Sequence, residues 1–219
     1  MCNLYSIKTN RAALARKFLL SENRMAAFEP LPAIFPGHMA PIIKQSADGE
    51  RELVMRSWGF ILLRDGYAPK RVTNTRDDKT HTKFWKDSFT RRRCLVPATA
   101  FSEPDEGKPA RWHWFCLMPV EERPLFAFGG VYRQWKGPIK KNSPNVDIEV
   151  FSFMTTLPNS LTSTINHERS PVLLTEEHDY QTWLTGTPEQ AFGLIKTSDP
   201  ERMRIVQSGF EKEDLVAAA

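Results

Sequence analysis

The sequence predicts a single α+β domain over residues 1–219, with a curved, largely antiparallel or barrel-like β-sheet core and peripheral helices. Three observations support this fold class. The chain has 219 residues, which is enough for one substantial core. Its composition, 41% hydrophobic and 26% charged, is that of a globular protein. Strand-like runs are interrupted by helices without a regular βαβ alternation.

The first part of the chain predicts a helix, a loop, a hairpin and a second helix. Residues 9–21 form an amphipathic pattern with Thr9 or Asn10 as N-cap. The side chains expected to be buried there are Leu14, Phe18 and Leu19. Residues 28–41 are rich in proline and predict a loop. Residues 41–60 predict a hairpin that turns at Ala47-Asp48-Gly49. Residues 80–93 place aromatic side chains at helical spacing and end in basic residues, which is typical of a helix C-terminus.

The middle of the chain contains β-branched and aromatic runs that predict strands. These runs are residues 93–101, 110–118, 124–135 and 147–156. Alternation within the second run places Cys116 toward the core. Residues 175–186 predict a helix capped by Thr175, and residues 187–196 a helix with a capping box of Thr187 and Gln190. Residues 202–207 predict a last strand.

Composition excludes several classes of protein. Cys2, Cys94 and Cys116 are far apart and odd in number, so a disulfide framework is excluded. The histidines lack metal-ligand spacing, and we expect neither a metal nor a cofactor. No apolar run is long enough to span a bilayer, and no signal peptide is visible, so we expect a cytoplasmic protein without a membrane partner. The net charge of +4 favours a polyanionic partner only slightly. We expect a monomer.

Several polar residues stand where this fold would favour other residue types. Asn74 and Arg76 lie in a polar segment, Glu103 ends an apolar strand, and His167, Glu168 and Arg169 precede another apolar strand. A partly buried glutamate has a raised pKa and can transfer protons near neutral pH, where histidine also titrates. Taken singly, each residue type also has an ordinary structural role: asparagine forms turns, a glutamate beside proline is solvated, and a histidine before a strand hydrogen-bonds a loop carbonyl.

Together these segments resemble the SOS response-associated peptidase (SRAP) family, whose members process abasic sites in single-stranded DNA. The resemblance rests on Cys2 directly after Met1, an Asn-x-Arg segment, a Cys-Leu-Val-Pro run that leads to Glu103, and a His-acidic-Arg-x-Pro-Val segment after a Thr-Thr strand end. It extends from residue 2 to about Leu184. Four motifs in this order are more specific than any one of them.

The resemblance implies roles for particular residues. By motif position, the catalytic residues are Cys2, which forms the crosslink, Asn74, Glu103 and His167. The implied DNA contacts are Arg76 and Arg169 to phosphates, and Trp58 near the DNA groove. The sequence departs from the family at Asn3 and Leu4, where glycine and arginine are usual, and around Glu103 and His167. An arginine that would help to hold DNA is therefore missing.

The chemistry of an N-terminal cysteine explains why this residue is required. After removal of Met1, the α-amine, with a pKa of about 8, condenses with the aldehyde of an abasic site to form an imine. The thiol then closes a five-membered thiazolidine. Glu103 and His167 supply proton transfers and Asn74 holds the sugar. The imine also makes β-elimination, and so AP-lyase activity, a plausible side reaction.

Further basic residues lie near these motifs and could follow a DNA backbone, with tryptophans as stacking surfaces. They are Lys70, Arg71, Lys83, Lys86, Arg91, Arg92 and Arg93, with Trp58, Trp85 or Trp112. Core packing and a solvated helix end are the ordinary alternatives. Two other functions stay open. One is a cysteine-dependent peptidase that processes itself, and the other is a non-catalytic module that binds single-stranded DNA.

Overall fold

A closed ring of strands forms the core of the computed structural model, which describes residues 2–165 and 168–215. Around this barrel, β12 (Asn145–Thr156) pairs with β4 (Arg51–Trp58), β4 with β3 (Met39–Gln45), β3 with β8 (Arg93–Ala98), and β8 with β11 (Phe126–Pro138). β11 then pairs again with β12 and closes the ring. These pairings are antiparallel except that of β12 with β4. The predicted α+β class with a largely antiparallel, barrel-like core is confirmed.

Three short strands extend the barrel and carry parts of the site. β7 (Asn74–Arg76) runs parallel to β12, with Asn74 opposite Phe153. β13 (Ser170–Pro171) pairs with the end of β12, and β14 (Leu173–Leu174) pairs with β11. The Asn-x-Arg segment and the segment after Glu168 therefore meet at the same end of β12.

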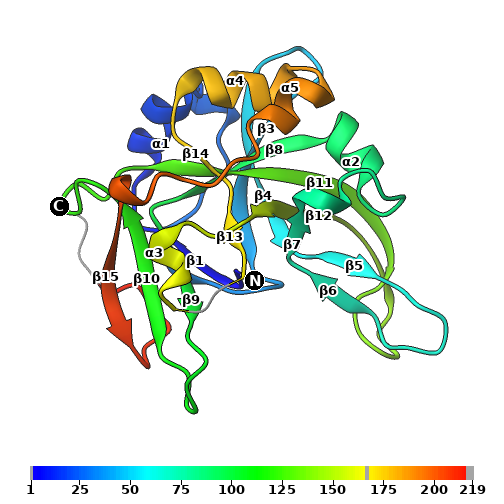
Figure 1. Cartoon of the computed structure of the whole chain (residues 1–219). Coiled ribbons are helices and arrows are strands. Elements are labelled where there is room, and N and C mark those ends of the chain that lie inside the picture. The colour runs from blue at the N-terminus through cyan, green and yellow to red at the C-terminus, as the bar shows by residue number, and fades with distance from the viewer. Residues whose placement is uncertain (1, 166–167, 216–219) are drawn as a thin grey trace.

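A second sheet packs beside the barrel and is seen at the lower left of Figure 1. Its strands, in spatial order, are β15 (Met203–Gly209), β10 (Trp112–Leu117), β9 (Ala100–Pro104), β1 (Leu4–Ile7) and β2 (Leu31–Ile34). β1 and β9 are antiparallel, with Leu4 opposite Ser102. A separate hairpin of β5 (Phe60–Leu62) and β6 (Lys70–Val72) projects from the other side of the barrel (Figure 1).

The helices lie at the periphery, and most of them cover the upper end of the barrel in Figure 1. They are α1 (Arg11–Phe18), α2 (Lys86–Arg91), α3 (Ser160–Ser163), α4 (Glu177–Thr185) and α5 (Pro188–Gly193), with 3-10 turns η1 (Glu22–Arg24), η2 (Asp77–Lys79) and η3 (Pro200–Arg202). Asn10 caps α1 by accepting from the Ala13 amide at 2.9 Å. The capping box of Thr187 and Gln190 on α5 is confirmed.

Several local predictions were wrong. Leu19 is 65% exposed because it adopts the left-handed conformation that ends α1. The segment 28–41 contains β2 and the start of β3; β2 is an edge strand, where proline is tolerated. The helix predicted over 80–93 covers Lys86–Arg91, and the cap of α4 is Glu176. The run 93–101 is divided between β8 and β9.

Two apolar clusters hold these layers together. In the barrel cluster, the Tyr5 ring packs edge-on against Trp58 at 5.0 Å, Phe128 at 5.6 Å and Phe153 at 6.0 Å between centroids. In the second sheet, Leu4, Ala100, Trp114 and Cys116 form a separate cluster, so Cys116 faces a core as predicted. The hairpin of β3 and β4, turning at Gly49, is also confirmed. Within the described residues, none of the helices has both the length and the apolar character that crossing a bilayer requires.

Candidate active site

Cys2 and Glu103 meet where β1 and β9 run side by side. Cys2 lies two residues before Leu4, and Leu4 is opposite Ser102 in the antiparallel register, so the start of β1 lies beside the end of β9. Both side chains are buried, Cys2 at 0% and Glu103 at 1% exposure. The thiol interacts with the Glu103 carboxyl group and also donates to the Leu4 carbonyl at 3.5 Å. Two residues that are distant in the sequence thus form one buried pair.

Burial determines the charge state of this pair. Desolvation raises the pKa of Glu103 to about 8, although its interaction with the Cys2 thiol acts in the opposite direction. Desolvation, and then the neighbouring Glu103, raises the pKa of the Cys2 thiol well above its ordinary value. At neutral pH both groups therefore hold their protons, and Glu103 can act as a proton donor.

Asn74 offers a buried hydrogen-bond donor beside a cavity. It is 3% exposed on β7, and its Oδ1 accepts weakly from Thr73 Oγ1 at 3.4 Å. Its Nδ2 has no hydrogen-bond partner among the residues that the structure describes. Asn74 lines a cavity of about 640 Å³ together with residues of the β5–β6 hairpin, including Tyr67 and Lys70. Since a buried donor without an acceptor is costly, this amide is suited to bind an oxygen atom of a substrate.

Trp58 is fully buried and forms a hydrogen bond with the residue that precedes Asn74. Its Nε1 donates to the Thr73 carbonyl at 3.1 Å, and its ring stacks on Phe153 with 5.2 Å between centroids. Through Tyr5, the same aromatic cluster reaches β1, which follows Cys2. Trp58 therefore has no ring face exposed for a DNA base in this structure, and its cluster connects β1, which follows Cys2, with the segment that leads into Asn74.

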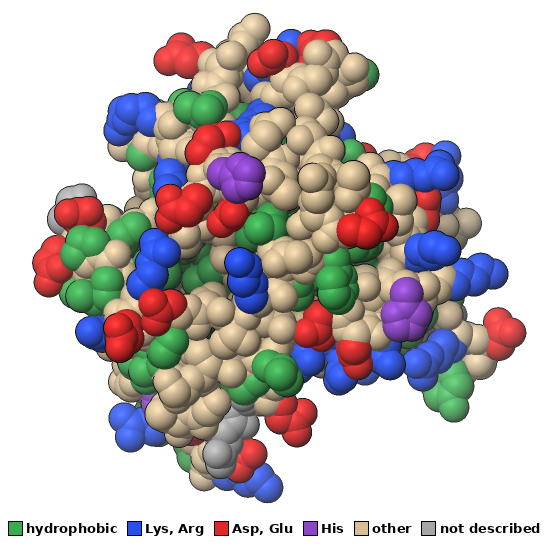
Figure 2. Space-filling model, turned by 45° about the horizontal axis from the view of Figure 1, so that its top comes forward, with side chains coloured by type: hydrophobic (Ala, Val, Ile, Leu, Met, Phe, Trp, Pro, Cys, Tyr) green, Lys and Arg blue, Asp and Glu red, His purple; other side chains and the backbone are tan. Residues whose placement is uncertain are grey.

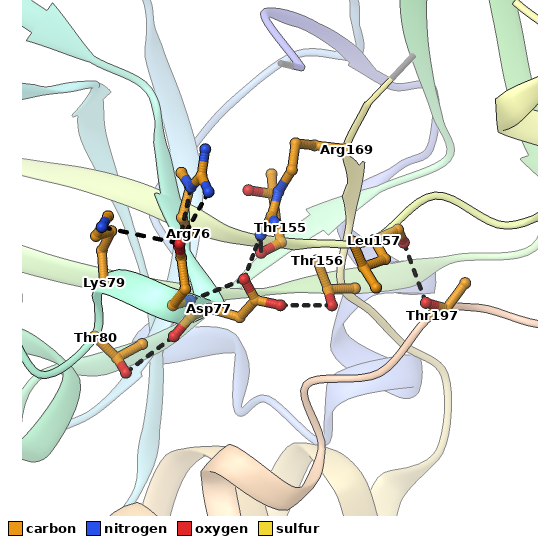
Figure 3. A network of polar contacts seen from close by, with 10 residues as sticks. Arg76, Asp77, Lys79, Thr80, Thr155, Thr156, Leu157, Arg169 and Thr197 are labelled. Atoms are coloured by element: carbon orange, nitrogen blue, oxygen red, sulfur yellow. Dashed lines mark hydrogen bonds and ion pairs between the residues drawn. The ribbon is translucent and has the colours of Figure 1, made fainter. Parts of the chain in front are cut away.

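Arg76 and Arg169 lie beside each other in one polar network (Figure 3). Arg76 is exposed and makes two hydrogen bonds of 2.9 Å to Asp78. Arg169 is only 11% exposed; it forms an ion pair with Asp77 and donates to the Thr155 carbonyl at 2.6 Å. The structure thus joins the Asn-x-Arg segment to the chain around Arg169. His167 lies outside the described residues.

The site includes residues for which the sequence holds no signal. Asp77 links the two motifs, but in the sequence it is one acidic residue among several.

Arg71, expected along a DNA backbone, uses its Nη1 inside the fold, at 3.2 Å from Ser57 Oγ and from two carbonyl oxygens. Arg93 is also buried and donates to the Trp183 carbonyl at 2.5 Å. Of the tryptophans considered as stacking surfaces for DNA bases, Trp85 is buried. The Lys212 ammonium lies over the Trp112 ring, 5.3 Å from its centroid.

The surface charge is mixed. Figure 2 shows Lys and Arg side chains along the side of the molecule that carries α2 and the β5–β6 hairpin, with Asp and Glu side chains between them. In the described part of the chain, His, Cys, Asp and Glu side chains do not gather in groups of three or more that could hold a metal ion.

The sequence matches a known family over nearly its whole length. The family is described as SOS response associated peptidase, SRAP, and the match covers residues 1–208. The chain belongs to the SRAP family. Membership associates it with the SOS response to DNA damage, as the resemblance predicted. No curated protein matches the sequence.

Solved structures show the same SRAP-like fold. A protein from Bordetella bronchiseptica superimposes with a TM-score of 0.73 at 18% identity, covering 95% of this chain and 98% of that one. A protein from Bacteroides thetaiotaomicron gives 0.67 at 22% identity, covering 93% and 90%. A phage-related protein from Bordetella bronchiseptica gives 0.69 at 17% identity, covering 93% and 92%. At these identities the likeness establishes the fold of this SRAP protein.

Proposed function

We propose that this SRAP protein processes abasic sites in single-stranded DNA by forming a covalent thiazolidine between Cys2 and the sugar aldehyde. The observation that carries the proposal is the buried contact between the Cys2 thiol and Glu103. Cys2 becomes reactive in this way once Met1 has been removed, because the reaction needs a free α-amine and a thiol on adjacent carbons.

The proposed reaction releases one water molecule. The α-amine of Cys2 bonds to C1′ of the open sugar, and the former carbonyl oxygen leaves as water after accepting a proton from Glu103. The thiol sulfur then adds to the iminium carbon and passes its proton to the Glu103 carboxylate. This returns Glu103 to its starting form, which suits a group whose pKa burial raises to about 8.

Other residues bind the strand in this proposal. Asn74 donates its amide, which has no partner among the described residues, to the sugar, and Arg76 and Arg169 contact phosphates on either side. Trp58 contributes by supporting Asn74 through Thr73. His167 assists opening of the sugar, as the family resemblance implies. The iminium also acidifies the neighbouring sugar proton, so β-elimination with strand cleavage accompanies crosslinking. One chain supplies Cys2, Asn74 and Glu103, and we propose a monomer that acts on cytoplasmic DNA.

The decisive test is a crosslinking assay on a single strand with one abasic site. Wild-type protein, shown by intact mass to lack Met1, is expected to give a heat-stable shifted band. Cys2→Ala is expected to give none, and Glu103→Gln to slow its formation roughly 100-fold, which is typical of the loss of a general acid. Cys94→Ala, which removes a buried thiol elsewhere, is the matched control. A processed wild-type protein without a band, or a band from Cys2→Ala, contradicts the proposal.

The family description favours a second candidate, a self-processing peptidase that uses Cys2. The raised pKa of the thiol disfavours it, because the thiolate is the attacking species. Removal of Met1 by purified wild-type protein, but not by Glu103→Ala, would establish this activity. Tight binding to undamaged single strands, without any covalent product from abasic strands, would instead indicate the non-catalytic module.

A further inference from the structure

Asp77 lies between the two segments that carry the predicted DNA contacts. It is the first residue of η2, directly after β7, and its Oδ2 accepts from Thr156 Oγ1 at 2.8 Å. Its Oδ1 forms an ion pair with Arg169 Nη2. Figure 3 shows the carboxylate between Arg169 and Thr156, beside the strand that leads back to Asn74. A single side chain therefore joins β7, the end of β12 and the chain before β13.

Among the described residues, the hydrogen bonds of the Arg169 side chain are made by one nitrogen of its guanidinium. Nη2 donates both to Asp77 and to the Thr155 carbonyl, whereas Nε has no partner within the described residues. The Arg169 side chain is 11% exposed and that of Asp77 is 22% exposed, so the ion pair is partly shielded from water. Anchoring at Nη2 fixes the direction of the guanidinium relative to β7 and the end of β12.

We infer that Asp77 is a positioning residue, which holds Arg169 at a fixed place relative to Asn74 so that a DNA phosphate and the adjacent sugar are bound in register. The inference rests on the proposed function and adds a residue that the family resemblance does not supply. Asp77 acts through Arg169 and does not touch the substrate.

A carboxylate at this place has two opposite effects on DNA. Its charge repels phosphates, so its removal strengthens simple electrostatic binding. By holding Arg169 in place, the carboxylate favours the reacting arrangement of the DNA. Small misplacements near a reacting centre lower the reaction rate strongly. Positioning therefore predicts that removal of the carboxylate lowers the rate while the affinity stays equal or becomes tighter. Repulsion alone predicts that both rise, and a general loss of folding predicts that both fall.

The test compares Asp77→Asn with Asp147→Asn, a matched change at another ion-paired aspartate, which lies 2.9 Å from Lys136 on the barrel surface. Saturating crosslinking rates are measured with an abasic single strand, and affinities with an undamaged strand in the Cys2→Ala background. Asp77→Asn is expected to slow crosslinking by up to about 100-fold while its affinity is equal or tighter. Asp147→Asn is expected to change neither. An unchanged or faster rate, or a parallel loss of rate and affinity, overturns the inference.

Two further measurements keep the inference separate from the proposed function. In an Arg169→Gln background, Asp77→Asn is expected to have little additional effect, because both changes remove the same contact. Amide hydrogen exchange is expected to become faster in Asp77→Asn at both 74–76 and 168–171. If wild-type protein forms no adduct, the proposed function fails, and exchange that is unchanged at both segments overturns the positioning role independently.

Discussion

The Cys2 thiol and the Glu103 carboxyl group contact each other in a position that excludes solvent from both side chains. The pairing of β1 with β9 creates this contact. Its main consequence is that a carboxyl group keeps its proton at neutral pH next to the atom proposed to attack the substrate. The protonation of Glu103 is therefore the first property to test.

We expect Glu103 to make the folded protein less stable as pH rises. Burial raises its pKa from 4.5 to about 8, so the folded state holds a proton that the unfolded chain has released. The corresponding stabilisation is complete below pH 4.5 and is lost as pH rises through about 8. At pH 9, Glu103→Gln should melt at least about 5 °C higher than wild type, with a smaller difference at pH 5.

Thermal unfolding between pH 5 and 9 measures this effect. Glu211→Gln, at an exposed position, is the control and should follow wild type throughout. Identical pH dependence of wild type and Glu103→Gln would show that Glu103 is ionised at neutral pH.

Asn74→Ala should separate activity from stability. The Asn74 Nδ2 group makes no hydrogen bond within the described protein, so its removal should cost less than about 1 kcal/mol of unfolding free energy. Crosslinking should nevertheless fall, by about ten-fold or more, if this amide binds the sugar. Urea unfolding and the crosslinking rate measure the two effects. A large loss of stability with normal crosslinking would assign Asn74 to the fold and not to the site.

Leu4→Arg, which restores the residue usual in the family, should destabilise the protein. Leu4 is fully buried against Ala100, Trp114 and Cys116, so an arginine there would bring an unpaired charge into an apolar cluster. We expect a loss of about 3 kcal/mol or more, measured by urea unfolding. Asn3→Gly, at an exposed neighbour, should be nearly neutral. A stable Leu4→Arg protein that binds DNA more tightly would mean that the arginine reaches the surface.

Asp214→Asn should be among the most damaging single changes outside the site. Asp214 and Arg123 form an ion pair in which both side chains are 0% exposed, and Asp214 also accepts from Ser6 Oγ at 2.6 Å. Removing the charge leaves the Arg123 guanidinium buried without its counter-ion, which costs about 3–5 kcal/mol. Chemical unfolding checks this, with Asp147→Asn as an exposed-pair control that should change little. An effect of Asp214→Asn as small as that of Asp147→Asn would show that the buried pair is not needed for stability.

Local patterns predicted much of the fold. The hairpin around Gly49, the capping box at Thr187 and the strand at 203–209 depend on turn chemistry, capping and periodicity within a few residues. β2 was missed because its prolines suggest a loop, and pairing with β1 at a sheet edge overrides that tendency. Leu19 was misplaced because a helix end, rather than the helical period, decides its direction.

The sequence by itself determined the order of the motifs and the reaction proposed for Cys2, because an amine and a thiol on adjacent carbons, once Met1 is removed, are a property of one residue. Only the tertiary structure decided which groups meet. It placed Glu103 beside Cys2, shielded that carboxyl group from water, buried Leu4 and tied Arg169 to Asp77. The reason is physical: a pKa depends on solvation and neighbouring charges, and long-range strand pairing sets both.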